Sequence, residues 1–313
     1  MKENIDIDLL NIELIISNDL LLDRSTGKNI VWATDMYNNF GSDFGKNNQM
    51  HIDSVISIYN RGLLVPRLMK SKDEQLERSK KNGEVFTPSW IINKMNNFCD
   101  EQWFGSRNVF NIENSDNTWT TTKKRIEFKK KNGWKEYVDS KRIEITCGEA
   151  PYIVSRYDVT NGNILKINER IGILDRKIRI INENVNTKKT WLQWVYRAYE
   201  SVYGYEYQGD SLFFARINLV QSFVDYYYDR FNELPEKRMI DKIIEIISWN
   251  FWQMDGLKDS TPTEKPVEKF EQLSLDDFFL NSNGKEDKII YCKIKDWRTN
   301  TIIEYKKIKE EDE

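Results

Sequence analysis

The sequence has 313 residues and a mass of 37.4 kDa, with 31% charged residues, 13% aromatic residues and a formal net charge of −3. This balance excludes a disordered chain and predicts a globular protein with one large or two smaller α/β domains. Three widely spaced cysteines and a single histidine, His51, argue against a disulfide framework, a structural zinc site and a Ser-His-Asp triad.

The first 80 residues predict a small α+β subdomain. An apolar stretch at 12–22 precedes a turn at 23–27 and a strand-like segment at 29–33. The start of the chain lacks the features of a signal peptide, and no stretch reaches the roughly 18 apolar residues of a membrane span. We therefore expect a cytoplasmic protein without a membrane partner. The charged segment 70–82 predicts an exposed helix or a linker.

Residues 81–258 predict a domain of alternating strands and helices. Strands are expected at 142–146, 202–207 and after 249, and helices at 171–181, 191–202, 211–231 and 237–247. Because parallel strands need crossover connections, this alternation favours a doubly wound parallel sheet with helices on its faces. The basic, aromatic segment 117–138 predicts short strands or loops.

Residues 259–313 predict a linker and a short C-terminal tail. The segment 258–269 is rich in Pro, Thr and charged residues, which is typical of a flexible connection. Strand-like segments at 288–292 and 301–305 predict a hairpin.

The segment Arg142–Ile153 has the pattern of a nucleotide-binding loop. An apolar strand ends in the acid Glu144, and Gly148 follows after a short step. Glycine lets the backbone approach a ligand at the carboxyl end of a strand. An ordinary strand-to-loop turn has the same pattern, so this segment alone does not decide the function.

The order of four segments resembles the N6-adenine DNA methyltransferases of restriction–modification systems, in particular type IIG-like enzymes and modification subunits. Gly83–Pro88 is similar to the family's Gly-x-x-(Phe/Tyr)-Thr-Pro segment, and Glu144–Tyr152 to its Asp-Pro-Ala-Cys-Gly-Ser-Gly-x-Phe loop. Glu149 and Ala150 stand where the family has Ser and its second Gly. The resemblance implies that the cofactor-binding residues of these two segments are Phe86, Thr87, Pro88, Glu144, Cys147, Gly148 and Tyr152.

Two further segments complete the resemblance. Val202–Tyr207 and the helix after it match a strand whose terminal acid accepts hydrogen bonds from the cofactor's ribose, a position that Glu206 takes here. Trp252–Leu257 resembles a segment whose aspartate accepts from the cofactor's adenine amino group, which points to Asp255. A plain Asp-Gly turn is the alternative interpretation of the last segment.

The resemblance implies a Rossmann-like S-adenosylmethionine-dependent methyltransferase domain at 81–258, with insertions at about 106–140 and 158–194. S-adenosylmethionine is the implied cofactor and double-stranded DNA the implied partner. The 313 residues contain no (Asn/Asp)-Pro-Pro-Tyr tetrapeptide, which in the family holds the flipped-out adenine, so no catalytic residue is assigned. The chain is then a fragment of a longer enzyme, one subunit of a split enzyme whose second polypeptide supplies the catalytic loop and target-recognition domain, or a non-catalytic remnant.

Two other functions remain open. A restriction endonuclease needs an Asp followed by Glu-x-Lys around a metal ion, and such triplets occur at 127–129 after Asp116 and at 304–306 after Asp296. A non-enzymatic DNA-binding module would use the basic stretch 123–135 together with Trp119 and Trp134. Surface charge on strands and loops is the simpler explanation of both patterns. We assign no metal ligand.

Overall fold

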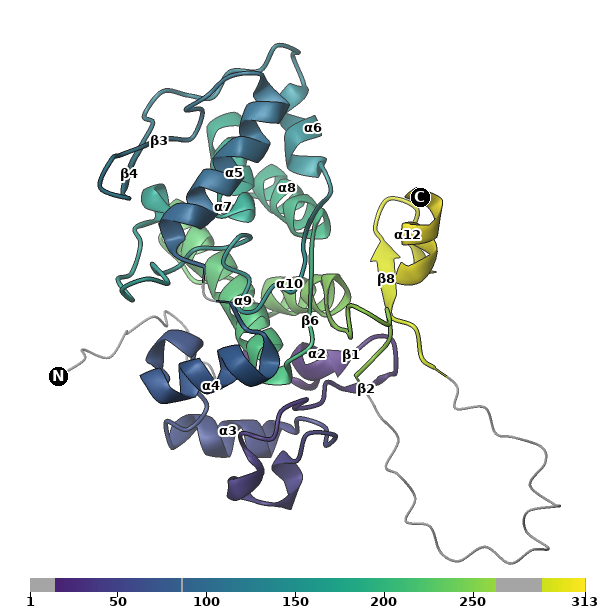
Figure 1. Cartoon of the computed structure of the whole chain (residues 1–313). Helices are drawn as coiled ribbons and strands as arrows, with labels where there is room; N and C mark the ends of the chain where they lie inside the picture. The colour runs from purple at the N-terminus through teal and green to yellow at the C-terminus, as the bar shows by residue number, and fades with distance from the viewer. Residues whose placement is uncertain (1–14, 86, 263–288, 313) are drawn as a thin grey trace, which may run out of the picture.

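The computed structural model describes residues 15–85, 87–262 and 289–312 (Figure 1). Its centre is a parallel three-stranded sheet in the order β5 (Arg142–Glu144), β6 (Val202–Glu206) and β7 (Phe251–Gln253). The prediction of an α/β protein with a parallel sheet is confirmed. No helix in the described ranges is long and apolar enough to cross a membrane.

Two pairs of helices connect the three strands. Between β5 and β6 the chain forms α7 (Ile173–Asn184) and α8 (Lys188–Glu200), and between β6 and β7 it forms α9 (Gly209–Phe231) and α10 (Lys237–Asn250). The predicted helical periodicity matches these four helices within a few residues. Helix α9 is surrounded by the core: most of its residues are buried, including the charged Asp210, Arg216 and Asp225.

The N-terminal part wraps around the beginning of α9. It contains short elements and three longer helices: α2 (Asn18–Leu21), β1 (Leu22–Asp23), β2 (Lys28–Asn29), the 3₁₀ helices η1 (Asn38–Phe40), η2 (Ser42–Phe44) and η3 (Arg67–Met69), α3 (Ile52–Asn60), α4 (Lys72–Asn82) and α5 (Ser89–Phe104). In Figure 1, α3 and α4 lie at one end of the molecule and α5 with α6 at the other. One hydrophobic cluster runs from Ile15 through Trp32 to Phe251. The domain boundaries at residues 80 and 258 remain predictions.

The remaining elements flank the sheet. Between α5 and β5 lie β3 (Asn111–Glu113), β4 (Trp119–Thr121) and α6 (Gly133–Asp139), and η4 (Ile167–Glu169) precedes α7. After the undescribed segment, β8 (Lys293–Asp296) and β9 (Thr301–Glu304) form an antiparallel hairpin followed by α12 (Tyr305–Asp312). The predicted C-terminal hairpin is therefore confirmed, with its first strand later in the chain than expected.

Two local predictions were wrong. The segment 117–138 contains β4 but ends in helix α6, because Tyr137 and Val138 are buried against the core and the Tyr137 hydroxyl donates to Asp100 at 2.7 Å. The strand expected at 29–33 shrinks to β2 and an isolated bridge between Val31 and Gln49. Ala33 then turns the chain with a φ of 53°.

Candidate functional site

A cavity of about 470 Å³ opens at the carboxyl ends of β5 and β6. In open α/β sheets this end of the strands is where ligands bind. The wall comes from four parts of the chain that are distant in sequence: Arg67, Leu68, Gly83, Glu84, Val85, Thr87, Glu144, Ile145, Thr146, Cys147, Gly148, Glu149, Pro151, Tyr152, Tyr157, Val159, Glu206, Tyr207, Gln208 and Ser211.

The structure brings most of the predicted site residues together here. Thr87, Glu144, Cys147, Gly148, Tyr152 and Glu206 all line the cavity. Pro88 is not in the lining; it caps the N-terminus of α5 directly after Thr87. Phe86 lies outside the described residues.

Asp255 does not reach this cavity. It lies after β7 in a tight turn, where its main chain pairs with Ser260 and its carboxylate accepts from the backbone of Leu257 at 3.0 Å. The same carboxylate is within 3.4 Å of the Lys258 ammonium. Of the two interpretations of this segment, the plain Asp-Gly turn therefore describes the local structure.

The loop after β5 has an unusual backbone conformation. Thr146, Gly148 and Ala150 have φ angles of 49°, 53° and 61°, in the left-handed region. Only glycine adopts this region without strain, and a β-branched residue such as threonine is rarely found there. A Cβ atom on Gly148 would meet no atom within 4 Å, so this glycine borders open space. Strained residues of this kind cluster at functional sites.

Glu206 anchors the loop to the end of β6. One of its carboxylate oxygens accepts from the Gly148 N–H at 2.9 Å, and the other accepts from the N–H groups of Tyr207 and Gln208 at 2.9 and 3.0 Å. The side chain is buried, and this burial raises its pKa, while the three N–H donors oppose the rise. A carboxylate offers about four acceptor positions, so one position remains for a further donor.

Glu144 is a buried carboxyl group with an open hydrogen-bonding position. Its Oε1 accepts from the Tyr152 N–H at 3.4 Å, whereas its Oε2 has no hydrogen-bond partner among the described residues. Burial raises the pKa of Glu144 well above its usual range, and the nearby Glu206 raises it further. The Oε1 atom of Gln208 is likewise buried without a partner in the described part of the chain.

The charge of the wall is strongly one-sided. Four glutamates line the cavity and one arginine, Arg67, opposes them. The backbone N–H of Arg67 donates to the Glu149 carboxylate at 2.6 Å, and the Arg67 guanidinium donates to the backbone carbonyl of Glu84 at 3.0 Å. Glu149 also accepts from the Tyr157 hydroxyl, and burial raises its pKa. Buried carboxyl groups of this kind favour a positively charged ligand, because a nearby cation stabilises their ionised form.

Sequence reasoning missed one side of this wall. Arg67 and Leu68 come from η3, in the region predicted to be a separate subdomain. Gln208 and Ser211 lie at the N-terminus of α9, shortly after Glu206. The turn that follows β6 was therefore the sequence feature that could have identified them as wall residues. The charged segment that was expected to be exposed forms α4, and its Arg78 is buried between Glu84 and Asp210.

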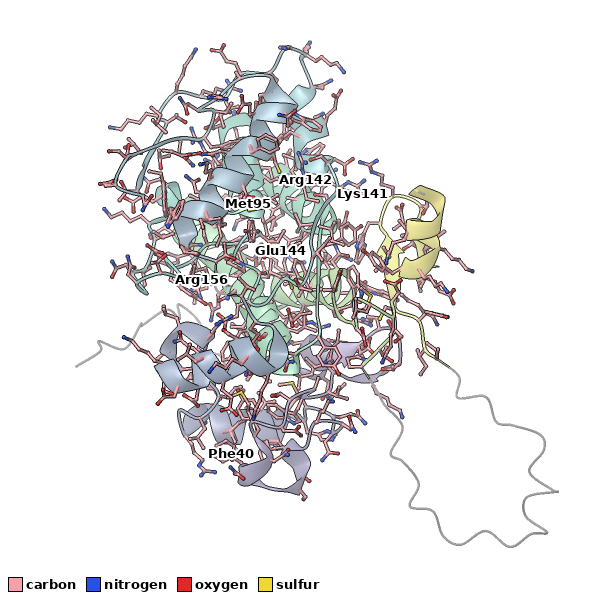
Figure 2. All side chains as sticks on the ribbon, in the orientation of Figure 1. Phe40, Met95, Lys141, Arg142, Glu144 and Arg156 are labelled. Atoms are coloured by element: carbon pink, nitrogen blue, oxygen red, sulfur yellow. The ribbon has the colours of Figure 1, made fainter. Side chains whose placement is uncertain are left out.

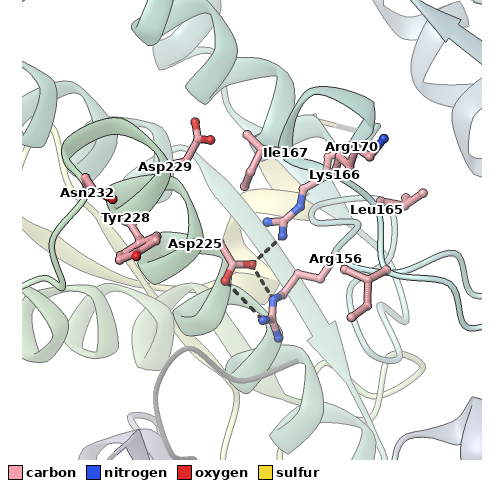
Figure 3. A pocket seen from close by; sticks show the side chains of 10 residues that line it. Arg156, Leu165, Lys166, Ile167, Arg170, Asp225, Tyr228, Asp229 and Asn232 are labelled. Carbon is pink, nitrogen blue, oxygen red and sulfur yellow. Dashed lines mark hydrogen bonds and ion pairs between the residues drawn. The ribbon is translucent and has the colours of Figure 1, made fainter. Parts of the chain in front are cut away.

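A second cavity of about 490 Å³ lies between the C-terminal half of α9 and the segment 156–170 (Figure 3). Arg156 and Arg170 both donate to the carboxylate of Asp225, at 2.9 and 2.6 Å. None of the predicted site residues lines this cavity. The Asp225 cluster joins the 156–170 segment to α9 and has no strand ends around it.

The structure does not assemble the alternative sites. Among the described residues, no three His, Cys, Asp or Glu side chains lie close enough together to hold a metal ion. Glu127 instead pairs with Lys124, and Asp296 with Lys141. In the basic stretch, Trp134 packs on Trp194 with ring centroids 4.7 Å apart, and the Trp119 indole donates to the Glu169 carbonyl. Both indoles are therefore engaged within the fold.

Comparisons with protein-family models, with curated proteins and with solved structures found no match to this chain.

Proposed function

We propose that this chain binds S-adenosylmethionine and is the cofactor-binding part of a DNA adenine-N6 methyltransferase with a Rossmann-like domain. The observation that carries the proposal is the cavity at the ends of β5 and β6, in which Glu144, Gly148 and Glu206 lie together. Glu144 and Gly148 come from one segment and Glu206 from a second, distant one, and these two segments carry most of the resemblance.

The chemistry of the wall fits this cofactor. S-adenosylmethionine has a sulfonium and an ammonium group, and the wall presents the carboxyl groups of Glu144, Glu149 and Glu206, whereas that of Glu84 is paired with Arg78. The unpartnered Oε2 of Glu144 would accept from the ammonium, and the free acceptor position of Glu206 would accept one ribose hydroxyl. Gln208 Oε1 is available to an amino group such as that of adenine. Asp255 has no part in this proposal because it lies outside the wall.

When bound, the cofactor supplies the methyl group that the adenine nitrogen would attack. The residues of this chain hold and orient it and exclude water, since they are buried around the cavity. The tetrapeptide that would position the adenine is missing from the 313 residues. We propose that the adenine is positioned by a group outside these residues, either in a further segment of a longer enzyme or in a second polypeptide.

Isothermal titration calorimetry with S-adenosylmethionine tests the proposal. We expect the wild-type chain to bind, and Glu206→Ala to bind more weakly by about 1–3 kcal/mol because hydrogen bonds to a charged acceptor are lost. Glu206→Gln, which keeps an acceptor oxygen for the loop, separates loss of ribose recognition from loss of folding. Asp255→Ala is the matched control and should bind as the wild type does.

The absence of heat and of thermal stabilisation at millimolar cofactor would refute the proposal. Equal weakening by Asp255→Ala and Glu206→Ala would also count against it, because the cavity would then not be the binding site.

A further inference from the structure

The second cavity, between α9 and the segment 156–170, contains a buried cluster in which positive charge exceeds negative charge. The guanidiniums of Arg156 and Arg170 both donate to the carboxylate of Asp225, and all three side chains are at most 8% exposed. Within this cluster, two guanidiniums against one carboxylate leave one positive charge. A buried charge lowers folding stability unless a further partner pairs with it.

Arg170 has donors that no group in the described residues uses. Its Nη2 donates to Asp225 at 2.6 Å, whereas its Nε and Nη1 are buried without a hydrogen-bond partner in the part of the chain that the structure describes. The Tyr226 ring lies against the face of the guanidinium, with its centroid 5.4 Å from Cζ. A guanidinium donates in its own plane, so an aromatic ring on its face leaves these edge donors open.

Asp175 is the other buried acid close to Tyr226, and its oxygens already have donors. One oxygen accepts from Ser155 and from the Gly172 N–H, and the other accepts from the Tyr226 hydroxyl at 3.0 Å. Asp175 therefore acts on Arg170 through space and supplies no hydrogen bond to Nε or Nη1. The open donors call for an acceptor from outside the described residues.

The rest of the wall combines an apolar part with charges at the rim. The apolar part consists of Ile164, Leu165, Ile167 and the ring of Tyr228. At the rim, the exposed Lys166 lies 3.8 Å from Glu169, and Asp229 is also exposed. The wall therefore offers a hydrocarbon surface beside a buried cation, which suits a ligand with one charged end and one apolar end.

A local bridge places these two parts of the wall side by side. Tyr157 pairs with Ile164, and the Leu165 N–H donates to the Arg156 carbonyl at 2.9 Å. Figure 3 shows both guanidiniums directed at Asp225. Arg156 lies apart from Glu144 of the first cavity (Figure 2), and the two walls, as far as the structure describes them, share no residue.

We propose that this second cavity binds a small organic carboxylate, whose charged end pairs with Arg170 and whose apolar end lies on Ile164, Leu165 and Ile167. A carboxylate is planar and matches the fork of a guanidinium. Its single charge equals the positive charge left by the Arg156–Asp225–Arg170 cluster, whereas a phosphate dianion would exceed it and be repelled by Asp225. The volume of about 490 Å³ is that of a small-molecule site.

Binding of aryl carboxylates to the full chain tests the chemistry of the site. The probes are phenylacetate, 4-phenylbutyrate and indole-3-propionate, each compared with its neutral amide, and phenyl phosphate, all in calorimetric titrations and thermal melts. We expect at least one carboxylate to bind at millimolar concentration or below and to raise the melting temperature, and its amide to bind roughly tenfold more weakly or less. No binding by any carboxylate, equal binding by the amide, or tighter binding by phenyl phosphate would overturn the proposal.

Variants test the location of the site. Arg170→Met should weaken carboxylate binding roughly tenfold or more, because it removes the charged donors, while Asp225 keeps Arg156 as its partner. Arg107→Met, at a 79% exposed arginine that pairs with Glu101, is the control and should bind as the wild type does.

A second variant leaves the buried cluster intact. Ile164→Glu adds a negative charge to the wall at a position that is 52% exposed, so the fold should tolerate it and carboxylate binding should weaken. Ile302→Glu, at an exposed isoleucine of β9, is its control. Unchanged binding by Ile164→Glu, or equal weakening by a variant and its control, would overturn the proposal. The proposal does not depend on S-adenosylmethionine binding, which is measured separately at the first cavity.

Discussion

Replacing Glu144 by glutamine should stabilise the chain without ligand, and the gain should grow with pH. Burial raises the pKa of Glu144 well above that of a free glutamate, about 4.3. Above pH 4.3 the unfolded chain loses this proton while the folded chain keeps it, so folding stability falls as the pH rises. The fall reaches about 1.4 kcal/mol per pH unit until the folded pKa is passed.

The magnitude follows from this window. Over the two pH units from 5 to 7, this slope bounds the loss of folding stability due to Glu144 at about 2.7 kcal/mol. Glutamine has nearly the shape of the protonated acid and does not titrate, so Glu144→Gln removes this term. Glu149 also has a raised pKa and shifts both proteins equally, whereas Glu206 interacts with Glu144. The difference between wild type and variant therefore reports Glu144 together with its coupling to Glu206.

Urea denaturation at pH 5, 6, 7 and 8 measures the effect. The control is Glu77→Gln on the exposed face of α4, where the carboxylate pairs only with Lys81. We expect the stability curves of Glu144→Gln and wild type to diverge with increasing pH, and those of the control and wild type to remain parallel. Parallel curves for Glu144→Gln would refute the assignment of a buried, protonated carboxyl group.

Three further predictions concern the framework of the site. Arg78→Met should lower the free energy of unfolding, measured with urea, by about 3–5 kcal/mol, because it leaves the buried Asp210 without the guanidinium that donates to it at 2.7 and 3.0 Å. The exposed control Lys81→Met should change this free energy little, and equal losses in the two variants would contradict the prediction. Gly209→Ala should lower the free energy of unfolding by about 3 kcal/mol or more, because its Cβ would lie 2.0 Å from the Val31 carbonyl oxygen. Gly45→Ala is the control, because its Cβ would lie 3.3 Å from the end of the Asn48 side chain and 3.7 Å from the nearest backbone atom, and an equal cost would refute the steric argument. Iodoacetamide should modify the exposed Cys99 in the folded protein, but Cys147 and Cys292 only after unfolding, because both thiols are buried and burial also raises their pKa. Mass spectrometry of the labelled peptides measures this. Rapid labelling of Cys147 in the folded protein would contradict its burial.

The sequence predicted the part of the site that strand direction determines. Glu144 and Glu206 each end an apolar strand, and the carboxyl ends of parallel strands meet at one edge of the sheet. The resemblance singled out these two acids, and the direction of the parallel strands accounts for their convergence. The long helices were also predictable: α10 carries strong apolar periodicity, and α9 is a long segment with apolar residues recurring at helical spacing.

Features that depend on tertiary contacts escaped prediction. The polar segment 70–82 did not reveal that Arg78 would be buried, because its partner Asp210 lies far along the chain. Arg216, which a sequence pattern treats as a solvated helix charge, is fully buried and donates to the carbonyls of Leu20, Leu22 and Phe251. Asp255 lies away from the cavity for a local reason: its carboxylate accepts from the backbone of its own turn.

The residues around the cavity lower the stability of the fold, which is itself an argument for a ligand. Thr146 and Ala150 hold left-handed backbone angles that cost about 1–3 kcal/mol each. Glu144 is buried with an unpartnered oxygen, and the Gln208 amide oxygen lies in the same wall without a partner. Such conflicts between local preference and global fold are expected where a site must remain ready for a ligand. A cationic molecule in the cavity would stabilise the ionised form of the buried carboxyl groups. The increase in folding stability on ligand binding should therefore be largest at the pH values where the unliganded chain has its lowest folding stability.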